Sequence, residues 1–434
     1  MLRMKAAARF DELRLLAFVA GLLVLGYVAV VASAAATFSA TPVVVPITFL
    51  GLALGLHLFL VARGARGDQL LLPLALGLTA IGLVEVQRLA PERLALQQLT
   101  WCALAAVAFV GAMLFPRDLS VLQRYKYTWA LLGLLLLISP LIPGLGREIN
   151  GARIWIGFGN LFQFQPSEAV KILLVVFFAA YLEEHREVLS AAPRRFGPIP
   201  VPPVPYLLPI LAMWAIAMVV MVFEKDLGAT LLFFGIFLAM LYVATGEAFY
   251  TLIGAVLLVA GGFVAYQMFG HVQARVDTWL APFAEESRFG PSFQLVQGLF
   301  AFANGGLFGA GLGNGMPERS PVVWSDFVFA AFTEETGLLG GLALLALYLV
   351  FVYRGMLIAV RAPTPFLQLL AAGLSFIVAF QTLVIVAGNA KLIPLTGVTL
   401  PFVSYGGSSL LTNFLLTALL IRISDVTARV RGGP

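Results

Sequence analysis

Long apolar segments separated by short polar ones dominate the chain. A helix that crosses the hydrocarbon core of a bilayer needs about 20 mostly apolar residues. The segments here are continuously apolar, whereas the strands of a membrane β-barrel alternate over about ten residues. The pattern therefore predicts an all-α polytopic membrane protein with about twelve spans, over residues 13–34, 43–62, 69–87, 97–115, 126–143, 167–183, 204–223, 227–245, 249–270, 327–353, 366–388 and 407–423.

Composition supports this class and excludes others. Apolar residues make up 61% of the 434 positions and charged residues 11%, with a mean hydropathy of +0.97. Soluble domains are roughly half apolar and about a quarter charged. The single cysteine, Cys102, excludes an internal disulfide framework, and the three histidines share no metal-ligand spacing. No basic soluble domain is present, so we expect no nucleic-acid partner. We also expect no organic cofactor.

Positive charge is unevenly divided between the two sets of alternating loops. Most of the 27 Lys and Arg residues fall on the side of the N-terminus, and an even number of spans puts the C-terminus on that side too. Cytoplasmic loops are enriched in Lys and Arg, so both termini are expected in the cytoplasm. The first apolar run is longer than the apolar core of a signal peptide, and we expect it to be retained as a helix.

The two long loops lie on the predicted outer side, at residues 144–166 and 271–326. The second loop far exceeds ordinary connections, and loops of that length are normally functional or disordered. Apolar positions at helical spacing in residues 292–303 predict a short helix, lying on the bilayer or packed on the bundle. The cytoplasmic loops carry no catalytic domain, so the chemistry is expected on the outer face or across the membrane.

Ionisable groups at the rim of the membrane are costly, which makes them candidates for function. Around the predicted start of the sixth span, Pro166 fits a helix N-terminus, and Glu168 and Lys171 are spaced to form an ion pair. Arg153 precedes them beside Trp155 at the interface. An interfacial anchor with a structural ion pair explains the same residues.

Two further charged clusters follow. Glu224, Lys225 and Asp226 lie at the junction of the seventh and eighth spans, where a solvated corner is the simpler interpretation. Asp326 lies between aromatic residues at the outer end of the tenth span. Poor solvation there should raise its pKa, which suits a general base or a cation ligand. The alternative is an ordinary charge at a helix N-terminus.

A broken segment at membrane depth, residues 394–413, forms the fourth candidate. Irregular backbone at this depth is tolerated only where it is buried in protein or lines a cavity. Gly406 and Gly407, followed by Ser408, open the last helix with free N–H groups at its positive end. This arrangement predicts an anion-binding site, with a plain helix cap as the alternative.

These clusters share the outer half of the predicted bundle. A carboxylate base beside an anion site and several cations suits transfer from a phosphate-linked leaving group, and the membrane makes a lipid phosphate the natural donor. The cations are Arg153, Lys171, Lys225 and Lys391.

Five ordered motifs in these segments resemble the SEDS family (shape, elongation, division and sporulation) of RodA and FtsW type, and more closely the RodA type. They are NGARIWI with QPSEAVK, then KDLGAT, FQLVQGLFAFANGGLFGAGLGNG, SDFVFAAFTEETGLLGG and IPLTGVTLPFVSYGGSS. The resemblance implies a ten-helix core over residues 67–434, preceded by an extension of two helices at 1–66. Lys225 is a departure, because the family often has proline there.

The family's activity implies a peptidoglycan glycosyltransferase that polymerises lipid II at the outer face of a bacterial cytoplasmic membrane, for cell elongation or division. By resemblance Asp326 is the catalytic base, which activates the acceptor 4-hydroxyl for an inverting displacement of polyprenyl pyrophosphate that leaves a β-1,4 link. Positions that match the family's polar cavity, loop and signature are Arg153, Glu168, Lys171, Gln294, Gln297, Ser404, Gly406, Gly407 and Ser408.

The resemblance also implies a partner, a class B penicillin-binding protein with transpeptidase activity. A divalent cation, Mg²⁺ or Mn²⁺, is expected on the pyrophosphate on charge grounds, since Mg²⁺ commonly takes one carboxylate plus substrate phosphates. Two other functions stay open: a lipid II flippase, whose broken helices would be typical of transporters, and a non-catalytic scaffold for a transpeptidase.

Overall fold

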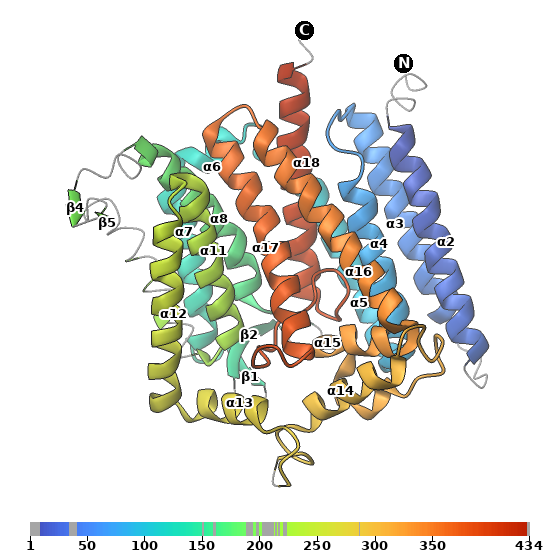
Figure 1. Cartoon of the computed structure of the whole chain (residues 1–434). Helices are drawn as coiled ribbons and strands as arrows, with labels where there is room; N and C mark the ends of the chain where they lie inside the picture. Colours follow the sequence, from blue (N-terminus) through green and yellow to red (C-terminus); the bar gives the residue numbers. More distant parts are fainter. Residues whose placement is uncertain are drawn as a thin grey trace. The chain divides into compact units, whose positions relative to one another are not determined.

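Helices make up most of the computed structural model, which describes residues 9–33, 41–149, 152–158, 162–187, 194–196, 199–201, 212, 215, 218–219, 224–285 and 287–431. Within these residues, nine helices are long and apolar enough to cross a membrane. The predicted all-α polytopic membrane class is therefore confirmed (Figure 1). The nine are α2 (Phe10–Ser33), α3 (Thr41–Arg63), α4 (Leu71–Leu89), α5 (Glu92–Leu114), α11 (Leu227–Thr245), α12 (Ala248–Met268), α16 (Val328–Arg361), α17 (Pro365–Asn389) and α18 (Gly407–Arg431).

Two other predicted spans are helices of a different kind. Helix α7 (Lys126–Ile138) is shorter and continues into η1 (Ser139–Leu141), after the short α6 (Ser120–Arg124). Helix α8 (Pro166–Glu184) carries charged residues at both ends and starts at Pro166, as predicted. The predicted span 204–223 lies largely outside the described residues. The total of twelve spans and the sides of the termini thus stay predictions.

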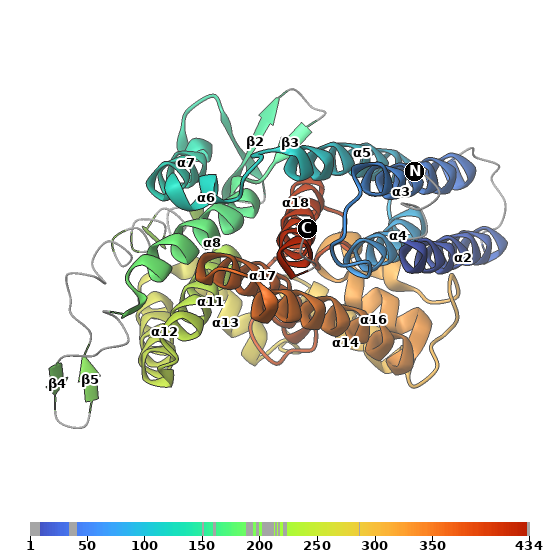
Figure 2. The ribbon, with the colours of Figure 1, turned by 90° about the horizontal axis from the view of Figure 1, so that it is seen from above.

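The chain divides into two compact units. Unit 1 comprises Met1–Leu114, Ala274–Arg354 and Gln381–Pro434. In it, α2 to α5 are neighbours and α18 packs along α5 and α4 (Figure 2). The start of α2 and the end of α18 lie at the same end of this unit (Figure 1). The division into an extension, 1–66, and a core, 67–434, stays a prediction.

Unit 2 comprises Phe115–Gln273 and Gly355–Phe380. Helix α8 packs between α7 and α11, and α11 also contacts α12. The sequence analysis did not predict strands here. Residues of the first long loop form an antiparallel sheet in the order β1 (Gly146–Ile149), β2 (Ala152–Phe158) and β3 (Phe162–Phe164), and a second pair is β4 (Arg194–Phe196) with β5 (Ile199–Val201). Aromatic and β-branched residues favour these strands.

The long outer loop contains short helices rather than irregular chain. These are α13 (Gly270–Leu280), α14 (Phe293–Gly305), η2 (Pro317–Arg319) and α15 (Val323–Asp326). Helix α14 confirms the helix predicted over residues 292–303. It packs against η2, and α15 contacts α4, so part of the loop is built onto the bundle.

A break in α16 anchors this loop. Gly337 has a φ of 74°, and the helix is interrupted there. The carbonyls of Glu334 and Glu335 accept hydrogen bonds from the N–H groups of Ala310 (3.0 Å) and Gly311 (2.9 Å). In the other direction, the N–H of Leu338 donates to a loop carbonyl at 2.9 Å. The loop backbone therefore satisfies groups that the break leaves open.

The side chains of the same two glutamates reinforce this contact. Glu335 Oε2 accepts from the N–H of Gly313 at 2.9 Å, and Glu334 Oε1 accepts from the N–H of Met316 at 3.3 Å. Both glutamates are buried. Their carboxylates hold residues 306–316 against α16.

We expect Gly337→Ala to destabilise unit 1. A positive φ costs a non-glycine residue roughly 1–3 kcal/mol, and the new Cβ would lie 2.4 Å from the carbonyl oxygen of Leu307. The measurement is the thermal unfolding midpoint of the purified protein in detergent. The matched control is Gly261→Ala on α12, where a Cβ meets nothing within 4 Å. Equal midpoints for the two variants would contradict this account.

Candidate active site

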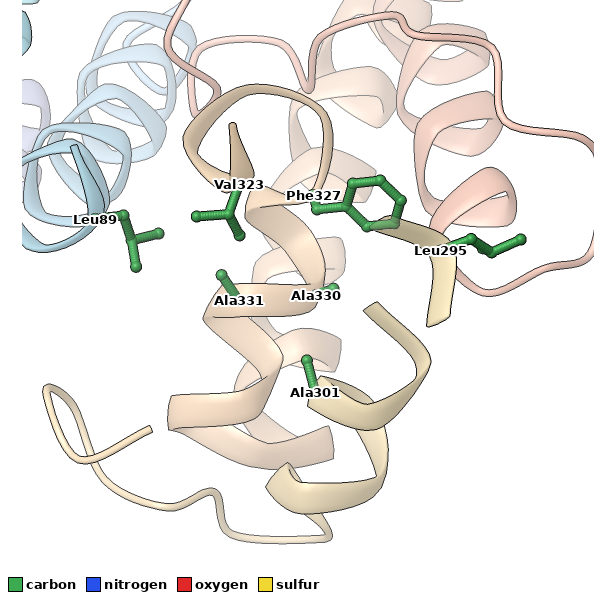
Figure 3. Close-up of a cluster of buried hydrophobic side chains, with 7 residues drawn as sticks. All are labelled: Leu89, Leu295, Ala301, Val323, Phe327, Ala330 and Ala331. Atoms are coloured by element: carbon green, nitrogen blue, oxygen red, sulfur yellow. The ribbon is translucent and has the colours of Figure 1, made fainter. Parts of the chain in front are cut away.

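Asp326 is the last residue of α15 and lies half-buried just before α16 begins. Its chain neighbours Val323 and Phe327 are buried in an apolar cluster with Ala330 and Ala331 of α16 (Figure 3). These contacts fix the main chain on both sides of the carboxylate.

Hydrogen bonds from two distant segments hold the same turn. The side-chain amide of Asn389, at the end of α17, donates to the carbonyl of Asp326 at 2.8 Å. Ser404 donates its hydroxyl to the carbonyl of Ser325, and the N–H of Tyr405 donates to the carbonyl of Trp324 at 2.9 Å. The predicted broken segment thus serves as the support of Asp326.

The electrostatic surroundings of Asp326 match the expectation from its sequence position. Burial raises the pKa of the Asp326 carboxyl above its usual range. A hydrogen bond from the side chain of Ser325 and the positive charge of Arg275 offset part of this rise. Arg275, on α13, also donates to the carbonyls of Leu395 (3.2 Å) and Thr396 (3.0 Å).

Sequence reasoning missed the roles of Asn389 and Arg275. Asn389 is fully buried at the end of a mostly apolar helix, and a polar residue in such a place was a visible signal. Arg275 offered no comparable signal. Its relation to Asp326 arises only when α13 folds against the broken segment.

The two predicted loop glutamines lie on α14. Gln294 Nε2 donates to the carbonyl of Pro321 at 3.0 Å. Gln297 lines a cavity of about 230 Å³ that is bounded by α14, η2 and the start of α16. The structure therefore places both near the segment that carries Asp326.

The start of α18 packs on α5. The N–H of Gly406 donates to Gln98 Oε1 at 3.4 Å, and a Cβ on Gly407 would lie 2.0 Å from the Trp101 ring. Ser408 is buried. Lys391 has a φ of 59°, and its carbonyl accepts from Trp279 Nε1 at 3.0 Å. The anion-binding role of this region stays a prediction.

In unit 2, the predicted ion pair is present. Lys171 Nζ lies 2.7 Å from Glu168 Oε2, and both residues are buried. Arg153 lies on β2, and its Nε has no hydrogen-bond partner within the described residues. Burial of Glu168 with Lys171 is consistent with an ion pair that neutralises itself on entering the membrane.

The cluster at residues 224–226 is not a solvated corner. Glu224 and Asp226 are buried, and only Lys225, with a φ of 62°, is exposed. Asp226 caps α11 by accepting the N–H of Ala229 at 2.9 Å, and it accepts a second bond from Gln165 at 3.2 Å. Burial, with the nearby Asp226 charge, raises the pKa of Glu224 to about 8.

Comparison with known proteins decides the family. Residues 69–429 match the family model described as "Cell cycle protein", which represents FtsW, RodA and SpoVE. This chain belongs to that family.

Curated members of the RodA/FtsW/SpoVE family align over most of the chain. It is 44% identical over 393 residues to "Peptidoglycan glycosyltransferase RodA" of Mycobacterium tuberculosis, covering 88% of this chain and 83% of the relative. It is 34% identical over 377 residues to "Probable peptidoglycan glycosyltransferase FtsW" of Pseudomonas fluorescens, covering 83% and 88%. The resemblance to the SEDS family, and to its RodA type, is confirmed.

Solved structures of the family share the fold. One, from work on the structural coordination of polymerization and crosslinking by a peptidoglycan synthase complex, has a TM-score of 0.68 at 25% identity, covering 84% of this chain and 99% of that one. The Rod shape determining protein RodA of Thermus thermophilus has a TM-score of 0.60 at 25% identity, covering 84% and 98%.

The predicted site residues of this RodA/FtsW family member fall into two groups. Unit 1 holds Gln294, Gln297, Asp326, Lys391, Ser404, Gly406, Gly407 and Ser408, and unit 2 holds Arg153, Glu168, Lys171 and Lys225. Within unit 1, a hydrogen bond joins Ser404 to the turn of Asp326. The functional role of each residue stays a prediction.

No group of three or more His, Cys, Asp or Glu side chains within the described part of the chain could hold a metal ion. Mg²⁺ commonly binds through one carboxylate plus substrate phosphates. The divalent cation expected on the pyrophosphate stays a prediction.

Proposed function

We propose that this chain is a peptidoglycan glycosyltransferase that polymerises lipid II into β-1,4 glycan strands. The proposal rests on the placement of Asp326 at the end of the outer loop, where its side chain is half-buried. The main chain around Asp326 is held by the apolar cluster and by hydrogen bonds from Asn389 and Ser404. Relatives that align over most of the chain bear the name peptidoglycan glycosyltransferase, which supports the same activity.

The reaction proceeds as a single displacement. Asp326 accepts the proton of the 4-hydroxyl on the acceptor N-acetylglucosamine. The acceptor oxygen then attacks the anomeric carbon of the N-acetylmuramic acid at the end of the lipid-linked chain. The bond from that carbon to the pyrophosphate breaks, and polyprenyl pyrophosphate leaves with the electron pair. One base and one attack invert the anomeric centre, which gives the β link.

Charge on the leaving group requires positive partners. We assign this role to Arg153, Lys225 and Lys391, with the N–H groups at the start of α18 as further donors. Lys171 is already neutralised by Glu168. Mg²⁺ or Mn²⁺ on the pyrophosphate would neutralise the same charge, and no step above depends on it. Gln294, Gln297 and Ser404 would orient the sugars or the turn of Asp326.

The setting and the partner complete the proposal. The protein acts at the outer face of a bacterial cytoplasmic membrane, beside a class B penicillin-binding protein that cross-links the new strands. A structural relative comes from a peptidoglycan synthase complex that couples polymerization and crosslinking. Its similarity to this chain supports such an assembly.

Asp326→Asn should fold normally and make almost no glycan. The change keeps the shape of the side chain and removes the base, which contributes about 10²–10⁴-fold to the rate. The measurement is glycan synthesis from purified lipid II by this protein with its transpeptidase partner. Equal amounts of glycan from the variant and wild type would show that Asp326 is not the base. If neither protein made glycan but lipid II crossed liposome bilayers, the protein would be a flippase.

The rate should fall in acid as Asp326 is protonated, because the base works only as the carboxylate. Burial raises the pKa of Asp326, so the rate should fall at a higher pH than it would with an exposed aspartate as the base. Arg275 lowers the pKa, and Arg275→Gln should therefore move this fall in rate to higher pH. The measurement is the initial rate against pH for both proteins, and a fall that moves to lower pH would contradict the assignment.

Lys225→Ala should reduce turnover only in part. The side chain is exposed beside the buried Glu224 and Asp226, so its loss should leave the fold intact while removing one contact to phosphate. We expect a rate loss of about 10–100-fold, in the range of one charge-assisted hydrogen bond. Lys225→Arg is the control that keeps the charge. An unchanged rate for Lys225→Ala would assign Lys225 no role in catalysis.

A further inference from the structure

The cavity bounded by α14, η2 and the first turns of α16 is built by small side chains. Ala301 of α14 faces Ala330 and Ala331 of α16 (Figure 3), and all three line the cavity. Gly298 also lines it, and a Cβ there would lie 2.7 Å from the ring of Phe327. The two helices meet through alanine and glycine, and this leaves a hollow of about 230 Å³.

Its polar lining includes a hydroxyl in need of a partner. Ser320 is buried, and its Oγ makes no hydrogen bond to any described residue. Buried polar groups are nearly always paired, with protein, water or ligand. The amides of Gln297 and Asn304 line the same cavity, so donors and acceptors converge on it.

The charges that line the cavity favour an uncharged ligand. Arg319 contributes one positive charge and Glu334 one negative charge. Glu334 is buried, and its Oε1 accepts from Asn304 at 3.4 Å. A phosphate or carboxylate entering the cavity would meet this carboxylate at close range, whereas hydroxyl and amide groups would bond to it.

The remaining walls of the cavity are apolar, and its volume limits how many sugar rings it can hold. Phe300 and Val323 give surfaces that suit the C–H face of a sugar. Sites for drug-sized ligands occupy about 300–1,000 Å³, so a cavity below that range takes a single ring with a small substituent. An N-acetylhexosamine has this size, an apolar face, hydroxyls and one amide.

The cavity wall includes two residues close to Asp326 in the chain, although Asp326 itself does not line it. Val323 and Phe327, which flank Asp326 along the chain, both line the cavity. We propose that this cavity binds the N-acetylhexosamine ring of the acceptor and presents its hydroxyl toward Asp326. This inference rests on the glycosyltransferase function proposed above and adds the place where the acceptor binds.

The first test compares two buried serines whose hydroxyls have no partner within the described residues. Ser320 lines the cavity, and Ser292, at the start of α14, does not. In polymerisation of lipid II, Ser320→Ala should raise KM by about 2–10-fold with kcat kept, as expected for one lost hydrogen bond. Ser292→Ala should leave both constants unchanged. Equal KM values for the two variants and wild type would overturn the proposal.

The second test measures binding without turnover. The probe is synthetic N-acetylglucosaminyl-N-acetylmuramic acid without lipid or pyrophosphate, followed by saturation-transfer NMR on the full chain in detergent. Wild type should give a signal that Ala331→Met, which fills the cavity, abolishes while its thermal unfolding midpoint is kept. A signal retained in Ala331→Met, or displaced by inorganic pyrophosphate, would contradict a sugar site in this cavity.

The two tests separate the failure of this inference from the failure of the proposed function. If wild type and both cavity variants polymerise lipid II normally, the glycosyltransferase function is supported and the acceptor site in this cavity is contradicted. Failure of wild type to polymerise lipid II, with or without binding of the disaccharide, would instead remove the function on which the inference rests.

Discussion

The structure depends on one constraint: a backbone that leaves helical geometry near the membrane must find its hydrogen-bond partners within the protein. Two segments of unit 1 meet this constraint. Residues 306–311 pair with the groups opened by the break at Gly337, and residues 404–405 pair with the turn at 324–325. The position of Asp326 is a consequence of the second pairing.

Charged side chains also find their partners within the protein. Glu335 accepts from Arg88 at 3.2 Å and from a loop N–H, and Arg422 donates to the carbonyl of Ala112 at 2.7 Å. Glu168 and Lys171 neutralise each other on α8. The carboxylates of Glu335 and Glu168 are held in these ion pairs and hydrogen bonds. At Asp326, by contrast, the bonds from distant segments go to the backbone of the turn. This contrast supports the proposed role of Asp326 as the base.

The sequence correctly predicted features that depend on residues close together in the chain. Continuous apolar runs gave the helices, Pro166 gave the start of α8, and the spacing of Glu168 and Lys171 gave their ion pair. The sheet of β1 to β3 was missed because its strands are short and their pairing is not visible in a hydropathy pattern. The support of Asp326 by Asn389 was missed because it joins residues 63 positions apart, a relation that only the fold creates.

The hydrogen bonds that hold the turn of Asp326 come from residues outside the cavity. The apolar support of the turn is shared with the cavity wall, because Val323 and Phe327 belong to both. Asn389, Ser404 and Tyr405 hold the turn of Asp326, and none of them lines the cavity beside it. The cavity owes its shape to α14 and to the small residues of α16. We therefore expect a change in α14 or η2 to alter acceptor binding in the proposed cavity while these hydrogen bonds to the turn of Asp326 remain. Such a separation lets one scaffold keep its chemistry while the acceptor-binding surface varies.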